Sequence, residues 1–315
     1  MSRHICVIGG TGFIGSHLVF MLANQGHQVL VPTRRRERHR QFLVHSNVRL
    51  VETNVYDKDA LQPLIEKTDC VINLVGILNE TGGATFQTAH VELVKTILAA
   101  MQSGGVSRLL HMSALNADAS NKQCDYLRSK GEAENLLMAA NSIQTTIFRP
   151  SVVFGPGDSF FNRFATLLRI TPLVFPLACP NARFSPVYVG NVVDAFSYAL
   201  DHADSAGQRY ELCGPQTFKL RELVEYTATQ MGIRRTVIGL PGFLSRLQAI
   251  VLGLMPGKPF SLDNYYALQI DSICTQSAFA DIGITPHSIQ AVVPGYLAGH
   301  NPNARYQLYR QHARR

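Results

Sequence analysis

Two side chains that could exchange protons stand one helical turn apart in the run Tyr126-Leu127-Arg128-Ser129-Lys130. Side chains four residues apart share one face of a helix. A lysine ammonium beside a phenol favours the phenolate and lowers the pKa of the tyrosine from about 10, so the tyrosine can exchange a proton near neutral pH. Ser113 lies thirteen residues before Tyr126 and could hydrogen-bond the same oxygen. Ser113, Tyr126 and Lys130 are therefore candidate catalytic residues, although this spacing is more often a surface pair.

A glycine-rich run, GGTGFIG, is the second candidate site. It fits G-x-G-x-x-G from Gly10 or G-x-x-G-x-x-G from Gly9, directly after a strand-like run and before an apolar helical pattern. Glycine makes the tight turn, its bare backbone admits a pyrophosphate, and the N–H groups of the helix start face the anion. The alternative is an ordinary strand-to-helix turn. The predicted dinucleotide contacts are Gly9, Gly10, Thr11, Gly12, Phe13, Ile14 and Gly15.

The second predicted strand, QVLVPT, ends at a cluster of arginines. A site that prefers NAD usually carries an acidic residue there to hold the ribose 2′-hydroxyl. This chain has Thr33, Arg34, Arg35 and Arg36 instead, and guanidinium groups suit a 2′-phosphate. The pattern favours NADP(H), with NAD(H) and a solvated arginine loop left open. Asp57, past the third strand, either contacts the adenine amino group or caps the following helix.

The elements that must position these residues alternate along the first half of the chain. Short β-branched runs such as HICVIGG, QVLVPT and CVINLVG alternate with helical patterns such as SHLVFMLANQG. This rhythm predicts an α/β fold, a Rossmann doubly wound parallel sheet, with a smaller C-terminal substrate lobe. We expect residues 1–155 and 185–214 to form the dinucleotide-binding domain. Residues 156–184 and 215–315 are expected to form the lobe.

Composition narrows the function classes. The 315 residues are 46% apolar and 16% charged, as in a globular protein. The net charge of +7 is concentrated in residues 34–40 and 305–315, with +4 each, so a broad nucleic-acid face is not expected. The six cysteines, expected to be reduced thiols, are Cys6, Cys70, Cys124, Cys179, Cys213 and Cys274. The dispersed histidines predict no metal site.

The sequence predicts neither a signal peptide nor a membrane span. The glycine loop follows the first apolar stretch at once. The best candidate span, Leu240–Gly257, contains Arg246 and two prolines and falls short of the ~20 apolar residues required. We therefore expect a cytoplasmic location, with a peripheral position at the inner face of the membrane as an open alternative.

Several motifs together resemble the short-chain dehydrogenase/reductase superfamily, in its extended or atypical epimerase/dehydratase-like branch. They are GGTGFIG, NLVG of the fourth strand, Ser113, Tyr126-x-x-x-Lys130, RPSVVFGPGD and PVYVGNVVDA. Within that branch, HMSALNA, YLRSKGEAE, FGPGDSFFNRFA and the arginine after the second strand resemble the dehydrogenase-like accessory subunit of respiratory complex I and its bacterial relatives. The resemblance covers about residues 4 to 230.

The resemblance implies roles for the candidate residues. Tyr126 would act as acid/base, Lys130 would bind the nicotinamide ribose, and Ser113 would orient the substrate. The implied cofactor contacts outside the glycine loop are Thr33, Arg34, Arg35, Asn54, Asp57, Leu74, Val75, Gly76, Lys130, Arg149 and Pro150. His90 matches the position of an asparagine that supports a proton relay in the superfamily, and histidine can also carry protons.

Two main hypotheses of function follow. The first is an NADP(H)-dependent oxidoreductase or epimerase/dehydratase related to complex I and ubiquinone metabolism, acting on a quinone-like or other apolar small substrate. The second is a non-catalytic, NADPH-binding structural or assembly protein of a respiratory or quinone-biosynthesis complex. A redox-sensing regulator is a third, more distant hypothesis. The expected partners are the dinucleotide, the substrate, and a membrane or respiratory complex, without nucleic acid.

Two apolar patterns in the lobe have open interpretations. The run DSFFNRF, from Asp158 to Phe164, either contacts an apolar substrate or packs in the core. A helical stripe is made by Phe243, Leu247, Ile250, Val251 and Leu254. It predicts either a helix packed on the dinucleotide-binding domain or an interfacial helix at a membrane. The basic tail residues Arg305, Arg310, Arg314 and Arg315 would assist the second arrangement.

Overall fold

The computed structural model describes residues 2–255 and 258–297. The chain divides into two compact units: unit 1 comprises Met1–Pro150 and Val193–Glu211, and unit 2 comprises Ser151–Val192 and Leu212–Arg315. The sequence predicted domain boundaries after residues 155, 184 and 214. In the structure the chain passes from one unit to the other after residues 150, 192 and 211. The short strands that flank these positions pair within unit 2, which accounts for the difference.

Unit 1 is built on a seven-stranded sheet with the order β3-β2-β1-β4-β5-β6-β11. Its strands are β1 (His4–Ile8), β2 (Gln28–Thr33), β3 (Val48–Glu52), β4 (Cys70–Asn73), β5 (Arg108–Met112), β6 (Gln144–Pro150) and β11 (Arg209–Leu212). The pairings from β3 through to β6 are all parallel. The strand order reverses between β1 and β4, which is the topology of a doubly wound sheet. The predicted fold class is confirmed.

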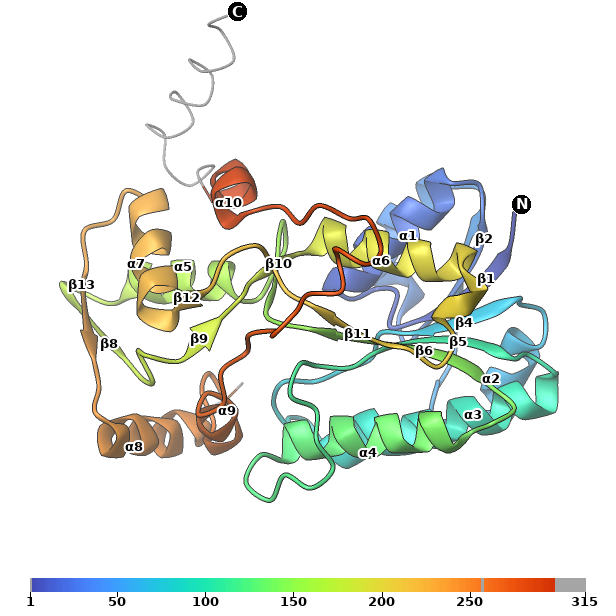
Figure 1. The fold of residues 1–315 in the computed structure, drawn as a ribbon, viewed down its shortest axis with the longest axis horizontal. Helices are drawn as coiled ribbons and strands as arrows, with labels where there is room; N and C mark the ends of the chain where they lie inside the picture. Colours follow the sequence, from blue (N-terminus) through green and yellow to red (C-terminus); the bar gives the residue numbers. More distant parts are fainter. Residues whose placement is uncertain (1, 256–257, 298–315) are drawn as a thin grey trace, which may run out of the picture. The chain divides into compact units, whose positions relative to one another are not determined.

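Helices cover both faces of this sheet. They are α1 (Phe13–Asn24), α2 (Lys58–Ile65), α3 (Leu93–Gly104), α4 (Asp125–Ala139) and α6 (Val189–Asp201), with a π-helical turn at Gln87–Glu92 and short 3-10 turns at Arg36–Val44 and Ala203–Ser205. Figure 1 shows α1 and α6 on one face and α2, α3 and α4 on the other. A sheet covered on both faces needs apolar residues on both sides of its strands, which explains the nearly continuous β-branched runs.

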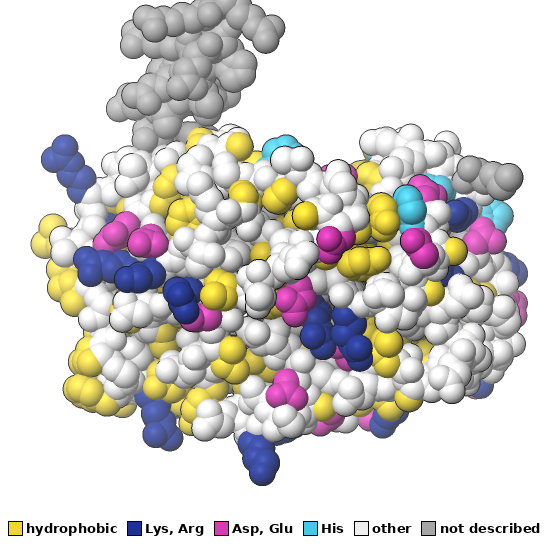
Figure 2. Space-filling model, in the orientation of Figure 1, with side chains coloured by type: hydrophobic (Ala, Val, Ile, Leu, Met, Phe, Trp, Pro, Cys, Tyr) yellow, Lys and Arg dark blue, Asp and Glu magenta, His cyan; other side chains and the backbone are white. Residues whose placement is uncertain are grey.

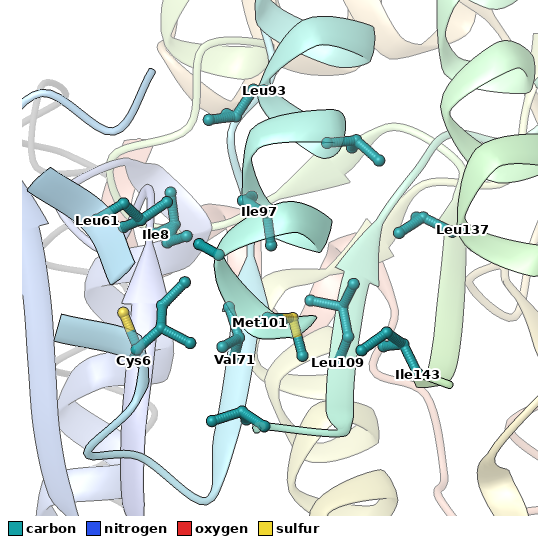
Figure 3. Close-up of a cluster of buried hydrophobic side chains, with 14 of the residues drawn as sticks. Cys6, Ile8, Leu61, Val71, Leu93, Ile97, Met101, Leu109, Leu137 and Ile143 are labelled. Atoms are coloured by element: carbon teal, nitrogen blue, oxygen red, sulfur yellow. The ribbon is translucent and has the colours of Figure 1, made fainter. Parts of the chain in front are cut away.

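One part of the core of unit 1 lies between the sheet and the α2–α4 layer. Figure 3 shows side chains of β1, β4 and β5 directed at α3. The labelled residues are Cys6, Ile8, Leu61, Val71, Leu93, Ile97, Met101, Leu109, Leu137 and Ile143, all buried. This packing holds the carboxyl ends of β1, β4 and β5 at one edge of the sheet. Ligands of doubly wound folds bind at that edge, where the strand order reverses.

Unit 2 consists of three small sheets and surrounding helices. The strand pairs are β7 (Val153–Phe154) with β10 (Val187–Tyr188), β8 (Val174–Leu177) with β13 (Thr236–Gly239), and β9 (Arg183–Phe184) with β12 (Phe218–Lys219). The helices are α5 (Phe161–Ile170), α7 (Leu220–Gln230), α8 (Gly242–Gly253), α9 (Leu262–Ala267) and α10 (Ile289–Leu297). Two apolar clusters form the core of this unit.

The aromatic run DSFFNRF belongs to that core. Phe161 is fully buried against Phe154 and Leu223. Phe160 and Phe164 are partly buried and pack against the same clusters. The core-packing interpretation is confirmed, because these rings fill the space between α5, α7 and the strand β7.

Two of the six cysteines contradict the prediction of reduced thiols. Cys213 and Cys274 form a disulfide within unit 2. They are 61 residues apart in the sequence, so their spacing gave no sign of the pairing. Cys6, Cys70, Cys124 and Cys179 remain thiols. Burial raises the pKa of the Cys6 and Cys70 thiols to about 12, which keeps them protonated.

Candidate functional site

Close packing inside the glycine loop requires three of its four glycines. Gly9 has a φ of +81°, and a Cβ there would lie 2.9 Å from Val75 N. A Cβ on Gly10 would lie 2.9 Å from the Val31 side chain, and one on Gly15 would lie 2.3 Å from Gly9 O. These contacts fold the loop tightly between β1 and α1. The sequence pattern is therefore explained partly by the protein's own packing.

Gly12 is different, because the surrounding protein leaves more room there than at the other three glycines. Its backbone is extended, with φ −77° and ψ −177°, and it is exposed. A Cβ on Gly12 would meet only Gly9 O, at 3.3 Å. Among the described residues no side chain caps α1, and its first turn, which contains Phe13, Ile14 and Gly15, has no acidic residue. Bare backbone at an uncapped helix start is an arrangement that binds anions such as phosphate.

The end of β2 presents cations beside this loop. Thr33 is buried, whereas Arg34, Arg35 and Arg36 are exposed. Strands β1 and β2 are parallel neighbours, so the arginines after β2 leave the same edge of the sheet as the glycine loop after β1. This end of the sheet can hold a phosphate or a ribose, and its charge favours the phosphate.

The segment after β3 is organised by its own turns. Asn54 Oδ1 accepts a hydrogen bond from Tyr56 N at 3.2 Å. Asp57 caps α2, since its Oδ1 accepts from Asp59 N at 3.0 Å and from Ala60 N at 3.4 Å. The helix-cap role of Asp57 is confirmed. Cofactor contacts of Asn54 and Asp57 stay predictions.

The loop after β4 lies against the glycine loop. Leu74 N donates to Ile8 O at 2.9 Å, and Val75 N donates to Asn73 Oδ1 at 3.1 Å. Gly76 is exposed, and a Cβ there would lie 3.3 Å from Lys130 Nζ. The loop thus joins the glycine loop to the candidate catalytic helix.

The first turns of α4 carry Tyr126 and Lys130, as the spacing predicted. Tyr126 is half-buried, and its ring lies edge-on to Phe86 and His90, with centroids 5.9 and 5.6 Å away. Lys130 is 3% exposed, and its Nζ donates to Met112 O at 2.9 Å. Burial lowers the pKa of Lys130 to about 8, against the opposing charge of Glu134. Tyr126 and Lys130 therefore lie in the partly buried wall of the site. They are not a pair on an exposed helix surface.

His90 has a structural role that the sequence did not reveal. Its Nε2 accepts from Ile77 N at 3.2 Å, so the neutral ring carries its proton on Nδ1 and donates to Ser129 Oγ at 2.8 Å. Ser129 Oγ donates in turn to Tyr126 O at 2.9 Å. Burial, then the charge of Lys130, lowers the pKa of His90 to about 2. Both ring nitrogens of His90 are therefore engaged and the ring stays neutral, and a part of His90 in a proton relay stays a prediction.

Sequence reasoning missed Glu134, which is the centre of a buried ion network. Glu134 is 1% exposed, and its Oε1 accepts from Ser113 Oγ at 2.5 Å. Arg149 binds both carboxylate oxygens, at 2.9 and 2.5 Å, and Arg209 Nε lies 3.1 Å from Oε2. The hydrogen bond to Glu134 raises the pKa of Arg149. In the sequence, the position of Glu134 one helical turn after Lys130 was the only sign that it belongs to the site.

This network changes how two predicted residues can act. The Ser113 hydroxyl donates its hydrogen bond to Glu134, so toward a substrate it would act as an acceptor. The Arg149 guanidinium is held by Glu134, and the neighbouring Pro150 O accepts from Leu115 N at 3.0 Å. Substrate and cofactor contacts of these residues stay predictions. Within residues 2–255 and 258–297 no histidine, cysteine or carboxylate cluster suits a metal ion, and no helix is long and apolar enough to span a bilayer.

Comparison with known proteins places this site in a family. The model of the NAD dependent epimerase/dehydratase family matches residues 5–213, which include the glycine loop and α4. The chain is 31% identical to the mitochondrial NADH dehydrogenase (ubiquinone) 1 alpha subcomplex subunit 9 of Arabidopsis thaliana, covering 92% of this chain and 76% of that protein. It is 28% identical to the mitochondrial NADH-ubiquinone oxidoreductase 40 kDa subunit of Neurospora crassa, covering 96% and 80%.

Solved structures agree at the level of the fold. DesIV, a dTDP-glucose 4,6-dehydratase from Streptomyces venezuelae crystallised with NAD, gives a TM-score of 0.75 at 18% identity, covering 96% of this chain and 98% of that one. This likeness shows the fold alone. The resemblance expected from the sequence is confirmed by the family match and by the 31% identity over nearly the whole chain. The chain belongs to the NAD dependent epimerase/dehydratase family.

Proposed function

We propose that this protein binds NADP(H) at the carboxyl edge of the unit 1 sheet and catalyses hydride transfer to or from an apolar small substrate. The observation that carries the proposal is the position of the Lys130 ammonium. It is buried, lies one helical turn from Tyr126, and faces the bare backbone of Gly76. A cation in this position suits both a ribose hydroxyl and an activated phenol.

The dinucleotide would extend over three segments of unit 1. Its pyrophosphate would bind at Gly12 and the start of α1, and the nicotinamide ribose would lie between Gly76 and Lys130. Arg34 and Arg35 would hold the 2′-phosphate, since no carboxylate follows β2 directly. Support for NADP(H) over NAD(H) rests on this charge pattern.

In the reduction direction the cofactor, when bound, supplies the hydride to a carbonyl carbon. Tyr126 gives the proton that the carbonyl oxygen takes up, and Lys130 stabilises the phenolate that remains. With a pKa of about 8, Lys130 is mostly protonated at pH 7 and able to do so. Ser113 would accept a hydrogen bond from the hydroxyl of the alcohol product, because its own O–H is donated to Glu134.

A second candidate function is supported by a separate observation. Two relatives with high coverage are named as a subunit of the NADH dehydrogenase (ubiquinone) 1 alpha subcomplex and as a subunit of NADH-ubiquinone oxidoreductase. The buried network around Glu134, and His90 bound to Ile77 and Ser129, give the site a rigidity that suits a nucleotide-holding subunit. In that case the nucleotide would stabilise unit 1 without turnover. The protein would then contact a respiratory complex at the membrane surface.

Nucleotide preference is tested by titrating the purified protein with NADPH, NADH and their oxidised forms, followed by fluorescence and thermal shift. We expect Arg34→Ser with Arg35→Ser to weaken NADPH binding by about tenfold or more and to leave NADH binding nearly unchanged. Arg38→Ser with Arg40→Ser, a matched exposed pair, is the control. Equal losses for both nucleotides would contradict the assignment of the 2′-phosphate.

The pyrophosphate position is tested by Gly12→Ala. Its new methyl group would occupy the space reserved for the ligand, so affinity should fall by about tenfold or more with little change in melting temperature. Gly295→Ala is the control, because a Cβ there meets nothing within 4 Å. Unchanged affinity in Gly12→Ala would remove the pyrophosphate from this loop.

Catalysis is tested by slow turnover of NADPH with a soluble quinone. Tyr126→Phe should lower the rate by at least about a hundredfold, whereas Tyr198→Phe should not. Tight NADPH binding without turnover, or turnover indifferent to Tyr126, would favour the nucleotide-holding function.

A further inference from the structure

Helix α8 of unit 2 is oriented with its large apolar side chains outward. Phe243 is 73% exposed, Leu247 53%, Val251 54% and Leu254 85%. At 100° per residue these positions, with Ile250, fall within one stripe about 100° wide. The two buried residues of the helix, Ser245 and Ala249, lie on the opposite side, next to the partly buried Leu252. The predicted stripe is correct, and it points to solvent.

Hydrogen bonds hold α8 in this orientation. Ser245 Oγ accepts from Cys179 N at 3.2 Å and donates to Leu240 O at 3.2 Å. Gln248 Nε2 donates to Pro176 O at 3.2 Å. Ser245, Ala249, the partly buried Leu252 and these hydrogen bonds therefore attach the helix to the end of β8. The outward position of the apolar stripe is a fixed property of unit 2.

The exposed apolar surface extends beyond the helix. Leu173 is 79% exposed and Val174 42%, at the start of β8, and Ile238 of β13 is 48% exposed. Figure 2 shows hydrophobic side chains at the lower left, where Figure 1 draws α8, and further up the left edge along β8 and β13. Exposed apolar patches of this extent mark interaction sites on soluble proteins.

The charge around this surface indicates the kind of partner. Residues 231–262 contain no aspartate or glutamate. The same segment contains four cationic residues, Arg234, Arg235, Arg246 and Lys258. Arg246 is exposed on α8 itself, at the edge of the apolar stripe. Apolar side chains on a segment that has cations and no carboxylate complement a surface of acyl chains and anionic headgroups, although Asp263 follows at the start of α9.

We propose that α8 binds the surface of an anionic phospholipid bilayer. Phe243, Leu247 and Leu254 enter the acyl region, and Arg246 contacts the headgroup phosphates. A helix of 12 residues is about 18 Å long and lies in the plane of the interface. The basic tail residues Arg305, Arg310, Arg314 and Arg315 lie outside the described residues and carry none of this argument. The inference goes beyond the proposed function and does not depend on nucleotide binding.

The test is flotation of the full chain with vesicles of pure phosphatidylcholine and with vesicles containing about a third phosphatidylglycerol. We expect binding to the anionic vesicles and weaker binding at high salt. Leu247→Gln with Leu254→Gln should lower the partition coefficient by about tenfold or more. The matched control is Leu43→Gln with Val44→Gln, two exposed apolar residues of unit 1. Arg246→Gln should weaken binding to anionic vesicles alone, by about fivefold.

Three outcomes would overturn the proposal. The wild-type protein could fail to bind the anionic vesicles, or the α8 pair could bind as well as the control pair. Light scattering could instead show a dimer that the α8 substitutions abolish, without lipid binding, and the face would then be an interface between copies. Thermal unfolding and NADPH titration of the same variants show whether they are folded. They also separate a failure of this proposal from a failure of the proposed nucleotide site.

Discussion

The two helices α4 and α8 both depart from the usual amphipathic pattern, and in opposite directions. Helix α4 buries Ser129, Lys130 and Glu134, each less than 4% exposed. Helix α8 exposes large apolar side chains and buries Ser245 and Ala249. A helix in a globular protein ordinarily buries its apolar side and exposes its polar side.

The two helices differ in whether the protein itself supplies partners for the unusual side chains. The buried polar groups of α4 are satisfied inside unit 1, by Ser113, Arg149, Arg209 and the Met112 carbonyl. The exposed apolar groups of α8 have no such compensation within the described chain. Helix α4 is therefore specified by the fold itself, whereas α8 is suited to a partner.

The largest expected effect comes from breaking the α4 network. Glu134→Gln leaves Arg149 and Arg209 without their shared carboxylate, so the free energy of unfolding should fall by about 3–5 kcal/mol. Denaturant unfolding measures it. Glu132→Gln on the same helix is the control, because its ion pair with Arg128 is partly exposed and should contribute under about 0.5 kcal/mol. Equal losses of stability in Glu134→Gln and Glu132→Gln would mean that the buried network contributes no more than a surface ion pair.

Low pH should also destabilise the protein through His90, whose ring is hydrogen-bonded to Ser129 of α4. The unfolded chain takes up a proton at His90 near pH 6.5, whereas the native ring has a pKa of about 2, so lowering the pH favours unfolding. The stability due to neutral His90 is fully present above pH 6.5 and should fall by about 2 kcal/mol between pH 7 and pH 5. His111 acts in the same direction, since burial lowers its pKa well below the usual value.

The variant His90→Gln isolates this effect. Denaturant unfolding at a series of pH values should show the loss between pH 7 and pH 5 reduced by about 2 kcal/mol relative to wild type. If His90→Gln keeps the wild-type profile, His90 is not a buried neutral group.

On α8, substitutions on the buried side, which carries Ser245 and Ala249, should lower the stability of the protein more than substitutions on the exposed side. Ala249 is fully buried, so Ala249→Leu overpacks the contact of α8 with the rest of unit 2. The free energy of unfolding should fall by about 1–3 kcal/mol. Urea unfolding measures it, and an unaffected variant would show that α8 is not attached through this side.

The smallest effect is expected for the outward side of the same helix. Leu254 is 85% exposed, so Leu254→Gln should change the free energy of unfolding by less than about 0.5 kcal/mol. A loss above about 1 kcal/mol would show that Leu254 packs against the protein and would remove the contrast between α4 and α8. Urea unfolding beside Ala249→Leu gives the comparison on one helix.

The sequence by itself determined the periodic and local features of this protein. The βα alternation predicted the doubly wound sheet, and the glycine run predicted the tight turn between β1 and α1, because these features depend on residues close together in the chain. Spacing also placed Tyr126 and Lys130 on one side of α4 and five apolar residues on one stripe of α8.

Only the tertiary structure decided where these groups point and which residues they meet. Periodicity shows which residues share a side of a helix, but it does not show whether that side faces the core or the solvent. The α8 stripe is exposed, the Glu134 network joins three separate strands or loops to α4, and Cys213 pairs with Cys274 across 61 residues. Each depends on contacts between residues distant in sequence, and those contacts exist only once the chain has folded.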